Sequence, residues 1–461
     1  MELDGLRIAQ ELGRANFKDK RLASRLQLLG LRLSAAPSLS FPKALPKSAE
    51  LEAAYRFFGN PLVTPEGILS GHFEATRERC LPENVVLVLH DTTKVVYRDD
   101  GERDLGGDKQ NFFAHGALAV TDDQRRLPLG ICGLHTWVRG RESGDEHARW
   151  GEMVDTASSN LAGAKLVHVM DREGDDYALL SQLVDGNHRF IIRALHNRTL
   201  LNAAVKADKL HDAIASVDAV VQREAELSRR KPSKLPKTKQ IHRPRTARTA
   251  LLSVGAMSVT LKRPKAQSRY SETKRSRHHE LAETLALNVV RVWEEHPPEG
   301  EPAVEWMLLT NEPIDDAMCL EQIVARYRAR WTIEEFFKAL KTGCAYETRQ
   351  LQDYESLINA LAVFAPIACS ILALRSESRR ASDEPQTVLT PTQLEVLGVL
   401  GRMKLPEQPT NQHVLLAVAA LGGHIRYNGP PGWQTLHAGY VELLTLTRGW
   451  EAAKLQLARD Q

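Results

Sequence analysis

Two mostly apolar runs, each leading directly into an aspartate, constrain the fold of this chain more than any other feature. The first run, Val85–Leu89, is rich in β-branched side chains and is followed closely by Asp91. The second run, Leu166–Met170, leads into Asp171. Continuous apolar runs of this length are typical of strands buried on both faces. The sequence therefore predicts two buried strands that each deliver an aspartate at the C-terminal end.

The rest of the pattern alternates strands with helices and predicts an α/β class of fold. Shorter strand signals stand at residues 116–120, 127–132, 188–194, 250–263 and 303–310. Apolar residues recur at helical spacing over residues 5–29, 48–60, 320–341 and from about 390 onward. In the second of these helices we expect Ser48 to be the N-cap and Asn60 to lie near the C-terminal stop.

A chain of 461 residues exceeds what one hydrophobic core usually serves, so two to four structural units are expected. With 43% apolar and 26% charged residues, the composition suits globular units rather than disordered or fibrous ones. We predict a helical unit at residues 1–75, a core at 76–390 and a helical unit at 391–461. A basic, β-rich segment at about 200–290 is predicted to be an insertion in that core.

The formal net charge of +3 conceals a local excess of Lys and Arg between Gln222 and Arg277, and this excess matters more than the total. The five cysteines form no CxxC pair, which argues against a zinc site or a disulfide framework and favours a reducing compartment. The first residues include acids and no continuous apolar stretch, so we expect no secretory signal and a cytoplasmic protein.

One stretch, Leu357–Leu374, approaches the length of a membrane span. Asn359, Pro366 and Ser370 interrupt it, and the sequence has no second stretch of this kind. We therefore expect a buried core helix and no membrane partner.

The segment Tyr327–Lys341, YRARWTIEEFFKALK, combines chemical and packing side chains. On an α-helix at about 100° per residue, its chemical residues fall within an arc of about 60°; they are Tyr327, Arg330, Glu334 and Lys341. The flanking face can pack on a sheet through Ile333, Phe336, Phe337 and Leu340. A carboxylate beside Arg, Lys and Tyr suits phosphate chemistry, because the carboxylate binds metal while the cations and the phenol hold phosphate oxygens. The alternative is a solvated face with i,i+3 and i,i+4 ion pairs.

Three acids on separate elements, Asp91, Asp171 and Glu334, can converge on a site for two metal ions. Phosphodiester hydrolysis by two metals needs carboxylates that hold the ions about 3.5–4 Å apart. We expect Mg²⁺ or Mn²⁺, two ions per site. For an aspartate that follows a strand the ordinary alternative is a turn or a cap, and Asp171 can cap a helix that starts at Arg172.

These residues resemble the motifs of the DDE transposases of the insertion-sequence-four group, in particular the transposon-five type. The match rests on HDTTKVVYR around Asp91, on MDREGDDY around Asp171, and on a Tyr-x2-Arg-x3-Glu-x6-Lys signature that begins at Tyr327. AAYRFFGN, FIIRALHNR, VEWMLLT and the helical C-terminus extend the resemblance through most of the chain. The Lys- and Arg-rich insertion departs from the family pattern.

The resemblance implies a ribonuclease H-like mixed-sheet core with a β-rich insertion, flanked by helical N-terminal and C-terminal domains. It implies a cut-and-paste transposase that binds transposon ends, cleaves them through a hairpin intermediate and transfers the strands to target DNA. The implied partners are transposon-end DNA, target DNA and a second copy of the chain in a synaptic homodimer, in a bacterial cytoplasm and associated with the nucleoid. Two alternatives stay open: a metal-dependent nuclease of the same core that does not join DNA, and a domesticated DNA-binding protein without catalysis.

The resemblance also implies individual roles. It gives metal binding and catalysis to the triad Asp91, Asp171 and Glu334. It gives contacts with phosphates near a transposon end to Tyr327, Arg330 and Lys341. Trp306 resembles an aromatic residue that stacks on a flipped base during hairpin formation. The alternative for Trp306 is a core aromatic on a buried strand.

Three further groups are assigned less directly. Arg193, His196 and Arg198 resemble DNA-contacting positions, with a solvated strand end as the alternative. Phosphate contacts in end recognition are predicted for Arg14, Lys18, Lys20 and Arg21, with a charged helix face as the alternative. Dimer contacts are predicted for the apolar side chains Val414, Leu415, Leu416, Val418 and Leu421, which could equally form that unit's own core.

Overall fold

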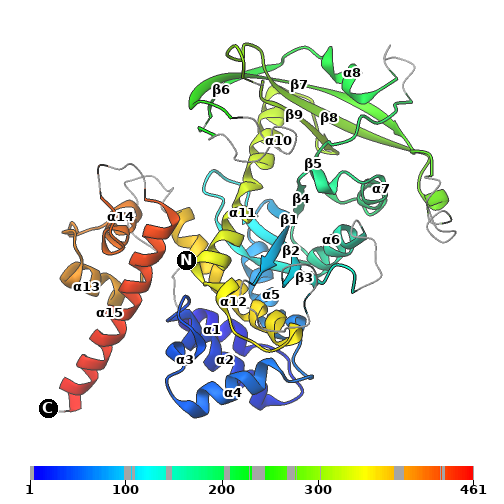
Figure 1. Cartoon of the computed structure of the whole chain (residues 1–461). Helices are drawn as coiled ribbons and strands as arrows, with labels where there is room; N and C mark the ends of the chain where they lie inside the picture. The colour runs from blue at the N-terminus through cyan, green and yellow to red at the C-terminus, as the bar shows by residue number, and fades with distance from the viewer. Residues whose placement is uncertain are drawn as a thin grey trace. The chain divides into compact units, whose positions relative to one another are not determined.

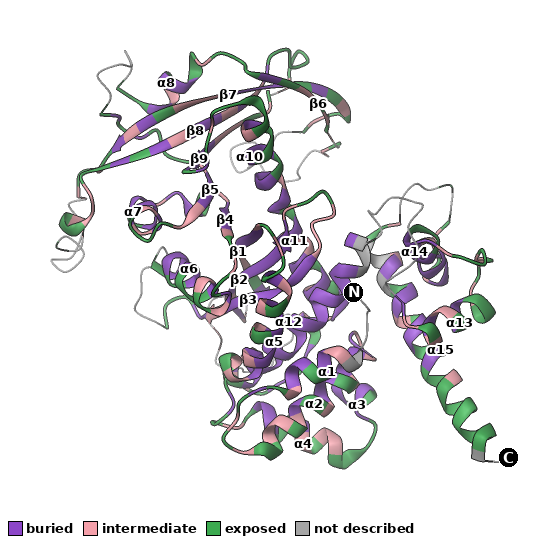
Figure 2. Ribbon diagram, turned by 180° about the vertical axis from the view of Figure 1, so that it is seen from behind, coloured by how far each residue is buried: buried purple, intermediate pink, exposed green. Residues whose placement is uncertain are grey.

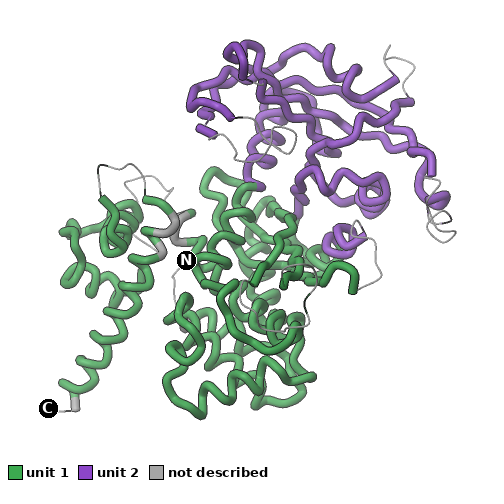
Figure 3. Tube along the Cα trace, in the orientation of Figure 1, with its two compact units in different colours: residues 1–144, 155–165, 331–461 green, residues 145–154, 166–330 purple. Residues whose placement is uncertain are grey.

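The computed structural model describes residues 5–97, 110–141, 148–201, 208–227, 244–266, 278–301, 303–377, 389–425 and 431–459, with a few single positions between them. Its contacts divide the chain into two compact units (Figure 3). Unit 1 comprises residues 1–144, 155–165 and 331–461, and unit 2 comprises residues 145–154 and 166–330. One helix, α6 (Ala148–Asn160), contributes residues to both.

Unit 1 begins with helices (Figure 1), which are α1 (Gly5–Gly13), α2 (Lys20–Ser34), α3 (Phe41–Ala44), α4 (Ser48–Phe58) and α5 (Pro65–Cys80). The single helix expected over residues 5–29 is in fact α1 and α2. The break is local in origin, because Asp19 is the N-cap of α2 and its side chain accepts a hydrogen bond from the Arg21 N–H. Ser48 is the first residue of α4 rather than its N-cap, which is Lys47, so that detail of the prediction was wrong.

The sheet of unit 1 consists of β1 (Val86–Val96), β2 (Asn111–Thr121) and β3 (Pro128–Trp137). The strands are antiparallel, and β2 pairs with both of the others. The apolar start of β1 is fully buried, as its composition predicted. The strand does not end at Asp91, however, because β2 pairs with it residue by residue as far as Val96. Asp91 therefore lies inside a strand rather than at its end.

Helix α12 (Tyr354–Glu377) is the apolar helix that the sequence predicted. It is long and apolar enough to cross a membrane, but 94% of its most apolar window is buried within the structure (Figure 2), which agrees with a core helix. Pro366 lies inside the helix and does not end it. The buried Asn359 side chain donates from Nδ2 to the carbonyls of Phe58 (2.9 Å) and Val63 (3.1 Å). The core helix thereby holds the end of α4 and the turn that follows it.

The remaining elements of unit 1 are α11 (Trp331–Lys338), the π-helical turn Ala339–Gly343, the 3₁₀ turn Tyr346–Thr348, α13 (Pro391–Leu400), α14 (Asn411–Leu421) and α15 (Trp433–Arg459). On α14, Val414 and Val418 are completely buried, Leu415 and Leu421 are buried and Leu416 is partly buried. Helix α14 packs against α15. Four of the five side chains therefore belong to that unit's own core, which was the alternative to dimer contacts, and a dimer contact by α14 stays a prediction.

Unit 2 holds a mixed sheet in the order β4-β5-β9-β8-β7-β6. Its strands are β4 (Leu166–Met170), β5 (Arg189–Arg193), β6 (Val221–Leu227), β7 (Arg248–Lys262), β8 (Thr284–Glu294) and β9 (Glu305–Thr310). β4 and β5 are parallel, and every other pair is antiparallel. The helical elements are the 3₁₀ turn Arg172–Gly174, α7 (Tyr177–Asp185), α8 (Leu210–Ala215) and α10 (Ala317–Ala329).

The core of unit 2 lies between this sheet and the helices α7 and α8, with Phe190, Leu180 and Leu287 among its side chains. Strands β6 to β8, from the segment predicted as an insertion, extend the sheet directly from β9. The most basic parts of that segment, residues 231–243 and 267–275, lie outside the described residues. The sheets and their covering helices confirm the α/β class, and the ribonuclease H-like assignment stays a prediction.

Candidate active site and nucleic-acid interface

Asp91 lies on the face of β1 that helix α11 covers. Its cross-strand partner on β2 is Gly116, and opposite residues of an antiparallel pair present their side chains on the same face. A Cβ atom at Gly116 would stand 3.3 Å from the ring of Phe337 and 3.9 Å from the side chain of Ile333, both on α11. The absence of a side chain at Gly116 therefore lets α11 approach the sheet closely beside Asp91.

Glu334 lies in the first turn of α11, the helix that contacts β1. Its neighbours Ile333 and Phe337 are buried, whereas Glu334 and Asp91 are only partly buried. The apolar face predicted from the sequence does pack on a sheet. Two of the three predicted metal ligands thus stand on contacting elements of unit 1.

Asp171 belongs to unit 2 and directly follows β4, as predicted. Its Oδ1 accepts a hydrogen bond from the Glu173 N–H at 2.8 Å, so it is also the N-cap of the following 3₁₀ turn. Among the described residues, no three His, Cys, Asp or Glu side chains are gathered as a metal site. The meeting of Asp171 with Asp91 and Glu334 stays a prediction.

The predicted single helix over residues 320–341 is divided. Helix α10 ends at Ala329 with Arg330 as its C-cap, α11 follows, and Lys341 lies in the π-helical turn. The signature residues therefore do not share one regular helix face. Lys341 donates to the carbonyl of Lys94 at 2.5 Å and forms an ion pair with Glu347 at 3.4 Å.

Three of the predicted DNA contacts meet within unit 2. The rings of Trp306 on β9 and Tyr327 on α10 lie 5.8 Å apart at a tilt of 59°. Arg193, at the end of β5, interacts electrostatically with Tyr327 and donates to the carbonyl of Glu305 at 3.3 Å. Burial lowers the pKa of Arg193, and the positive charges of Arg172 and Arg330 act in the same direction.

This cluster suits an anion beside an aromatic surface. Guanidinium groups that lie near one another create a region of positive potential, and this potential attracts the negatively charged oxygens of a phosphate. Trp306 is partly buried rather than fully enclosed. Arg330 is 8% exposed and Tyr327 is 5% exposed. Arg172, which the sequence did not single out as a DNA contact, belongs to the group because its charge acts on Arg193.

His196 and Arg198 are engaged by one acid that sequence reasoning missed, Asp175. Arg198 is buried and pairs with Asp175 at 2.5 Å, and its guanidinium lies 5.8 Å from the ring centre of Tyr177. The Asp175 carboxylate also accepts the backbone N–H of the exposed His196 at 2.8 Å. The geometry uses Arg198 to hold the chain after β5, and a DNA contact by Arg198 stays a prediction.

The predicted N-terminal contacts Arg14, Lys18, Lys20 and Arg21 are all exposed. Arg14 pairs with Glu78 at 3.0 Å, and Arg21 pairs with Asp19 at 3.0 Å. Such surface pairs contribute little and exchange readily with other anions. The exposure of these four side chains fits phosphate contacts, and it fits a charged helix face equally well.

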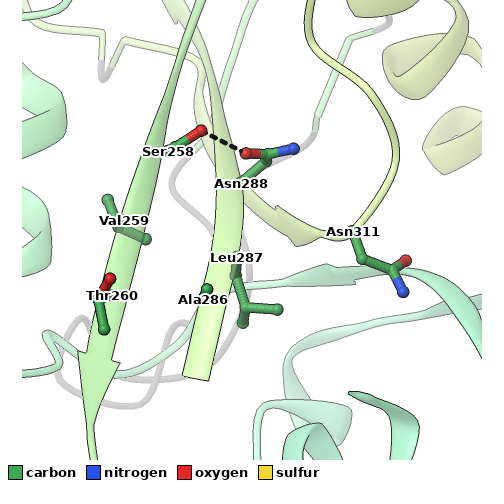
Figure 4. Close-up of a pocket in the computed structure, with 7 residues that line it drawn as sticks. All are labelled: Ser258, Val259, Thr260, Ala286, Leu287, Asn288 and Asn311. Carbon is green, nitrogen blue, oxygen red and sulfur yellow. Dashed lines mark hydrogen bonds between the residues drawn. The ribbon is translucent and has the colours of Figure 1, made fainter. Parts of the chain in front are cut away.

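A hollow on the strands β7 and β8 of unit 2 contains none of the predicted site residues (Figure 4). Its lining is uncharged, and Ser258 donates to Asn288 across it at 2.7 Å. Asn311, also in the lining, donates to the carbonyl of His188 and accepts from Phe190 N–H. These side chains serve to join neighbouring segments of the unit.

Two family models match this sequence. The model described as Transposase DNA-binding matches residues 7–63, and the model described as Transposase DDE domain matches residues 88–365, which is more than half of the chain. A solved structure described as the piggyBac transposase synaptic complex with hairpin DNA is similar at 12% identity and a TM-score of 0.34. That match covers 81% of this chain and 65% of the other.

Proposed function

This chain belongs to the Transposase DDE domain family, and on that premise we propose that it is a cut-and-paste DNA transposase of the insertion-sequence-four type. The proposed reaction is metal-dependent cleavage of transposon-end DNA through a hairpin intermediate, followed by transfer of the strands to target DNA in the bacterial cytoplasm. The observation that carries the proposal is the match over residues 88–365, within which Asp91 and Glu334 stand on the contacting elements β1 and α11.

The proposed metal ligands are Asp91, Asp171 and Glu334. Carboxylate oxygens are the donors that Mg²⁺ and Mn²⁺ prefer, so the donor chemistry fits these ions. Two bound ions would activate the attacking oxygen and stabilise the leaving oxygen of a phosphodiester. The protein's own role is to orient these carboxylates. The Thr92 N–H donates to Oδ1 of Asp91 at 2.9 Å, and the Glu173 N–H donates to Oδ1 of Asp171.

The proposed role of the unit 2 cluster is to hold the DNA end. Arg193 and Arg330 would bind phosphate oxygens, and Tyr327 supports the ring of Trp306, on which an unpaired base would stack. Stacking one base on an aromatic ring is worth about 1–3 kcal/mol, which offsets part of the cost of unstacking it from the duplex.

Synapsis of two ends by a homodimer is also part of the proposal. With the α14 side chains buried, the candidate surface moves to the last part of α15, where residues 451–458 are all exposed. Leu455 and Leu457 there are 63% and 64% exposed.

The decisive experiment uses acid-to-amide variants that keep size and capping. Asp91→Asn, Asp171→Asn and Glu334→Gln are each expected to abolish Mg²⁺-dependent nicking and hairpin formation on DNA that carries the element's own ends. Asn caps a helix nearly as well as Asp does, so Asp171→Asn removes the charge without removing the cap. Glu335→Gln, the neighbouring acid on α11, is the matched control and should retain cleavage.

Retained cleavage in any one of the three variants would count against the proposal. A product analysis on a target plasmid gives the second test. Cleavage without insertion products would identify a nuclease that does not join DNA instead of a transposase.

A further inference from the structure

Behind Asp91, on the opposite face of the sheet of unit 1, the residues Thr92 and His115 form a cross-strand pair. The backbone pattern shows what kind of pair it is. Val86 N–H points away from β2 and donates to the carbonyl of Lys165, whereas Tyr97 N–H donates to Gln110 at the start of β2. Because N–H directions alternate along a strand, Thr92 N–H points away from β2, as that of Val86 does. Thr92 and His115 are therefore a non-hydrogen-bonded pair, the kind whose side chains lie closest.

The N–H of Thr92, which points away from β2, finds its hydrogen-bond acceptor in the side chain of the preceding residue, Asp91. It donates to Oδ1 of Asp91 at 2.9 Å. Further along the same strand, the outward N–H of Val96 is likewise held by a carboxylate, that of Glu347, at 3.1 Å. These bonds fix one oxygen of each carboxylate relative to the strand.

On the other face, the hydroxyl of Thr92 is hydrogen-bonded to Nδ1 of His115 at 2.9 Å. His115 is completely buried, and burial, aided by His135, lowers its pKa to about 3. A hydrogen bond in such low-dielectric surroundings is stronger than one in water, and losing it leaves a buried polar group unsatisfied. The ring of His90 lies 5.8 Å from that of His115 and packs beside it.

We propose that His115 is a positioning residue for the metal-binding aspartate: through the Thr92 hydroxyl it holds the Thr92 backbone, whose N–H orients the carboxylate of Asp91. The inference rests on the proposed function of Asp91. A group that orients a metal ligand typically changes metal affinity by about 10- to 100-fold when it is removed. The pair Thr92–His115 and the carboxylate lie on opposite faces, so the effect reaches the metal only through the strand.

The test measures Mn²⁺ binding to the purified full-length chain by electron paramagnetic resonance, alongside Mn²⁺-dependent nicking. Thr92→Val and His115→Phe keep the approximate volumes and remove the hydrogen bond. Each is expected to raise the Kd for Mn²⁺ about tenfold, and the double variant should be no weaker than either single variant, because both remove the same bond. Thr92→Ser keeps the hydroxyl and should therefore retain most of the Mn²⁺ affinity of the unaltered chain. Thr136→Val, on β3, removes a hydroxyl that bonds Tyr354 instead and should leave the Kd unchanged.

Each contrary result has a distinct meaning. Unchanged Mn²⁺ affinity in Thr92→Val and His115→Phe, or losses that add up in the double variant, would overturn the inference. Asp91→Asn that binds Mn²⁺ as well as the unaltered chain does would instead overturn the proposed role of Asp91. A His115→Phe chain that fails to fold leaves Thr92→Val and Thr92→Ser to decide the matter.

Discussion

The buried carboxylate of Glu11 gives the sharpest stability prediction. Its Oε2 is 2.7 Å from Nδ1 of His72, and its Oε1 accepts from Arg79 at 2.6 Å. The other ring nitrogen of His72 accepts the Ile131 N–H at 3.1 Å, so the ring proton is on Nδ1 and is donated to Glu11. Burial alone would raise the pKa of Glu11, but the hydrogen bond from His72 and the charge of Arg79 outweigh it and lower the pKa from 4.5 to about 2.

A lowering of this size corresponds to about 3 kcal/mol of stabilisation. Removing one partner of a buried ion pair costs about 3–5 kcal/mol, which agrees. We therefore expect Glu11→Gln, which preserves the volume, to reduce the free energy of unfolding by about 3 kcal/mol. Glu78→Gln is the matched control, because its partner Arg14 is exposed and such surface pairs contribute about 0–1 kcal/mol.

Urea unfolding followed by far-UV circular dichroism measures both variants. The difference between the unaltered chain and Glu11→Gln should be full above pH 4.5 and should shrink as the pH falls toward 2, because a depressed carboxyl pKa stabilises only the ionised form. Burial also lowers the pKa of His72, so protonation of His72 favours the unfolded chain and stability should begin to fall below its usual pKa of 6.5. Equal unfolding midpoints for Glu11→Gln and Glu78→Gln would refute the reasoning.

Three further changes test other parts of the structure. Gly116→Leu should lower the nicking rate at least tenfold, since a Cβ there already stands 3.3 Å from Phe337 and a larger side chain must displace α11; a normal rate would show that α11 need not lie so close. Arg198→Met should destabilise unit 2 by about 3–5 kcal/mol in thermal unfolding, because it leaves Asp175 buried without its cation, and a loss under 1 kcal/mol would contradict this. Val418→Asp should unfold the C-terminal helices in circular dichroism, whereas Leu455→Asp should keep them folded and weaken self-association in sedimentation; the reverse pattern would restore α14 as the dimer surface.

The strands were predictable where composition alone decides. The first four residues of β1, Val86–Leu89, are buried because a continuous apolar run leaves no polar face for solvent. The end of the same strand was not predictable. Residues Thr92 to Lys94 are polar, and the strand continues through them to Val96 because β2 pairs with each of these residues. Which strand pairs with which is decided by the tertiary structure, and the sequence of one strand alone does not reveal it.

The helix ends show the same division. The Thr64 cap of α5 and the Thr390 cap of α13 follow the expected chemistry, with the side-chain oxygen accepting a backbone N–H. The break at Arg330 carries no such signal: the residue has helical backbone angles, and no Gly or Pro stands near it. Periodicity therefore predicted one continuous helix across Arg330 and Trp331, where unit 2 ends in the sequence and unit 1 resumes. Counting degrees around a helix overestimated how regular the signature segment is.

The buried polar groups were the hardest to predict, because their partners come from distant segments. Arg349 is 2% exposed; its guanidinium donates to the carbonyls of Pro37 and Leu39 and lies 4.4 Å from the ring centre of Phe364. Asn359 makes bonds of the same kind to the carbonyls of Phe58 and Val63. The segment matched as DNA-binding and the segment matched as the DDE domain are thus separate in sequence but share buried hydrogen bonds within unit 1. A DNA end held by the first segment would be positioned by the same core that positions Asp91, so recognition and cleavage need no flexible linker between them.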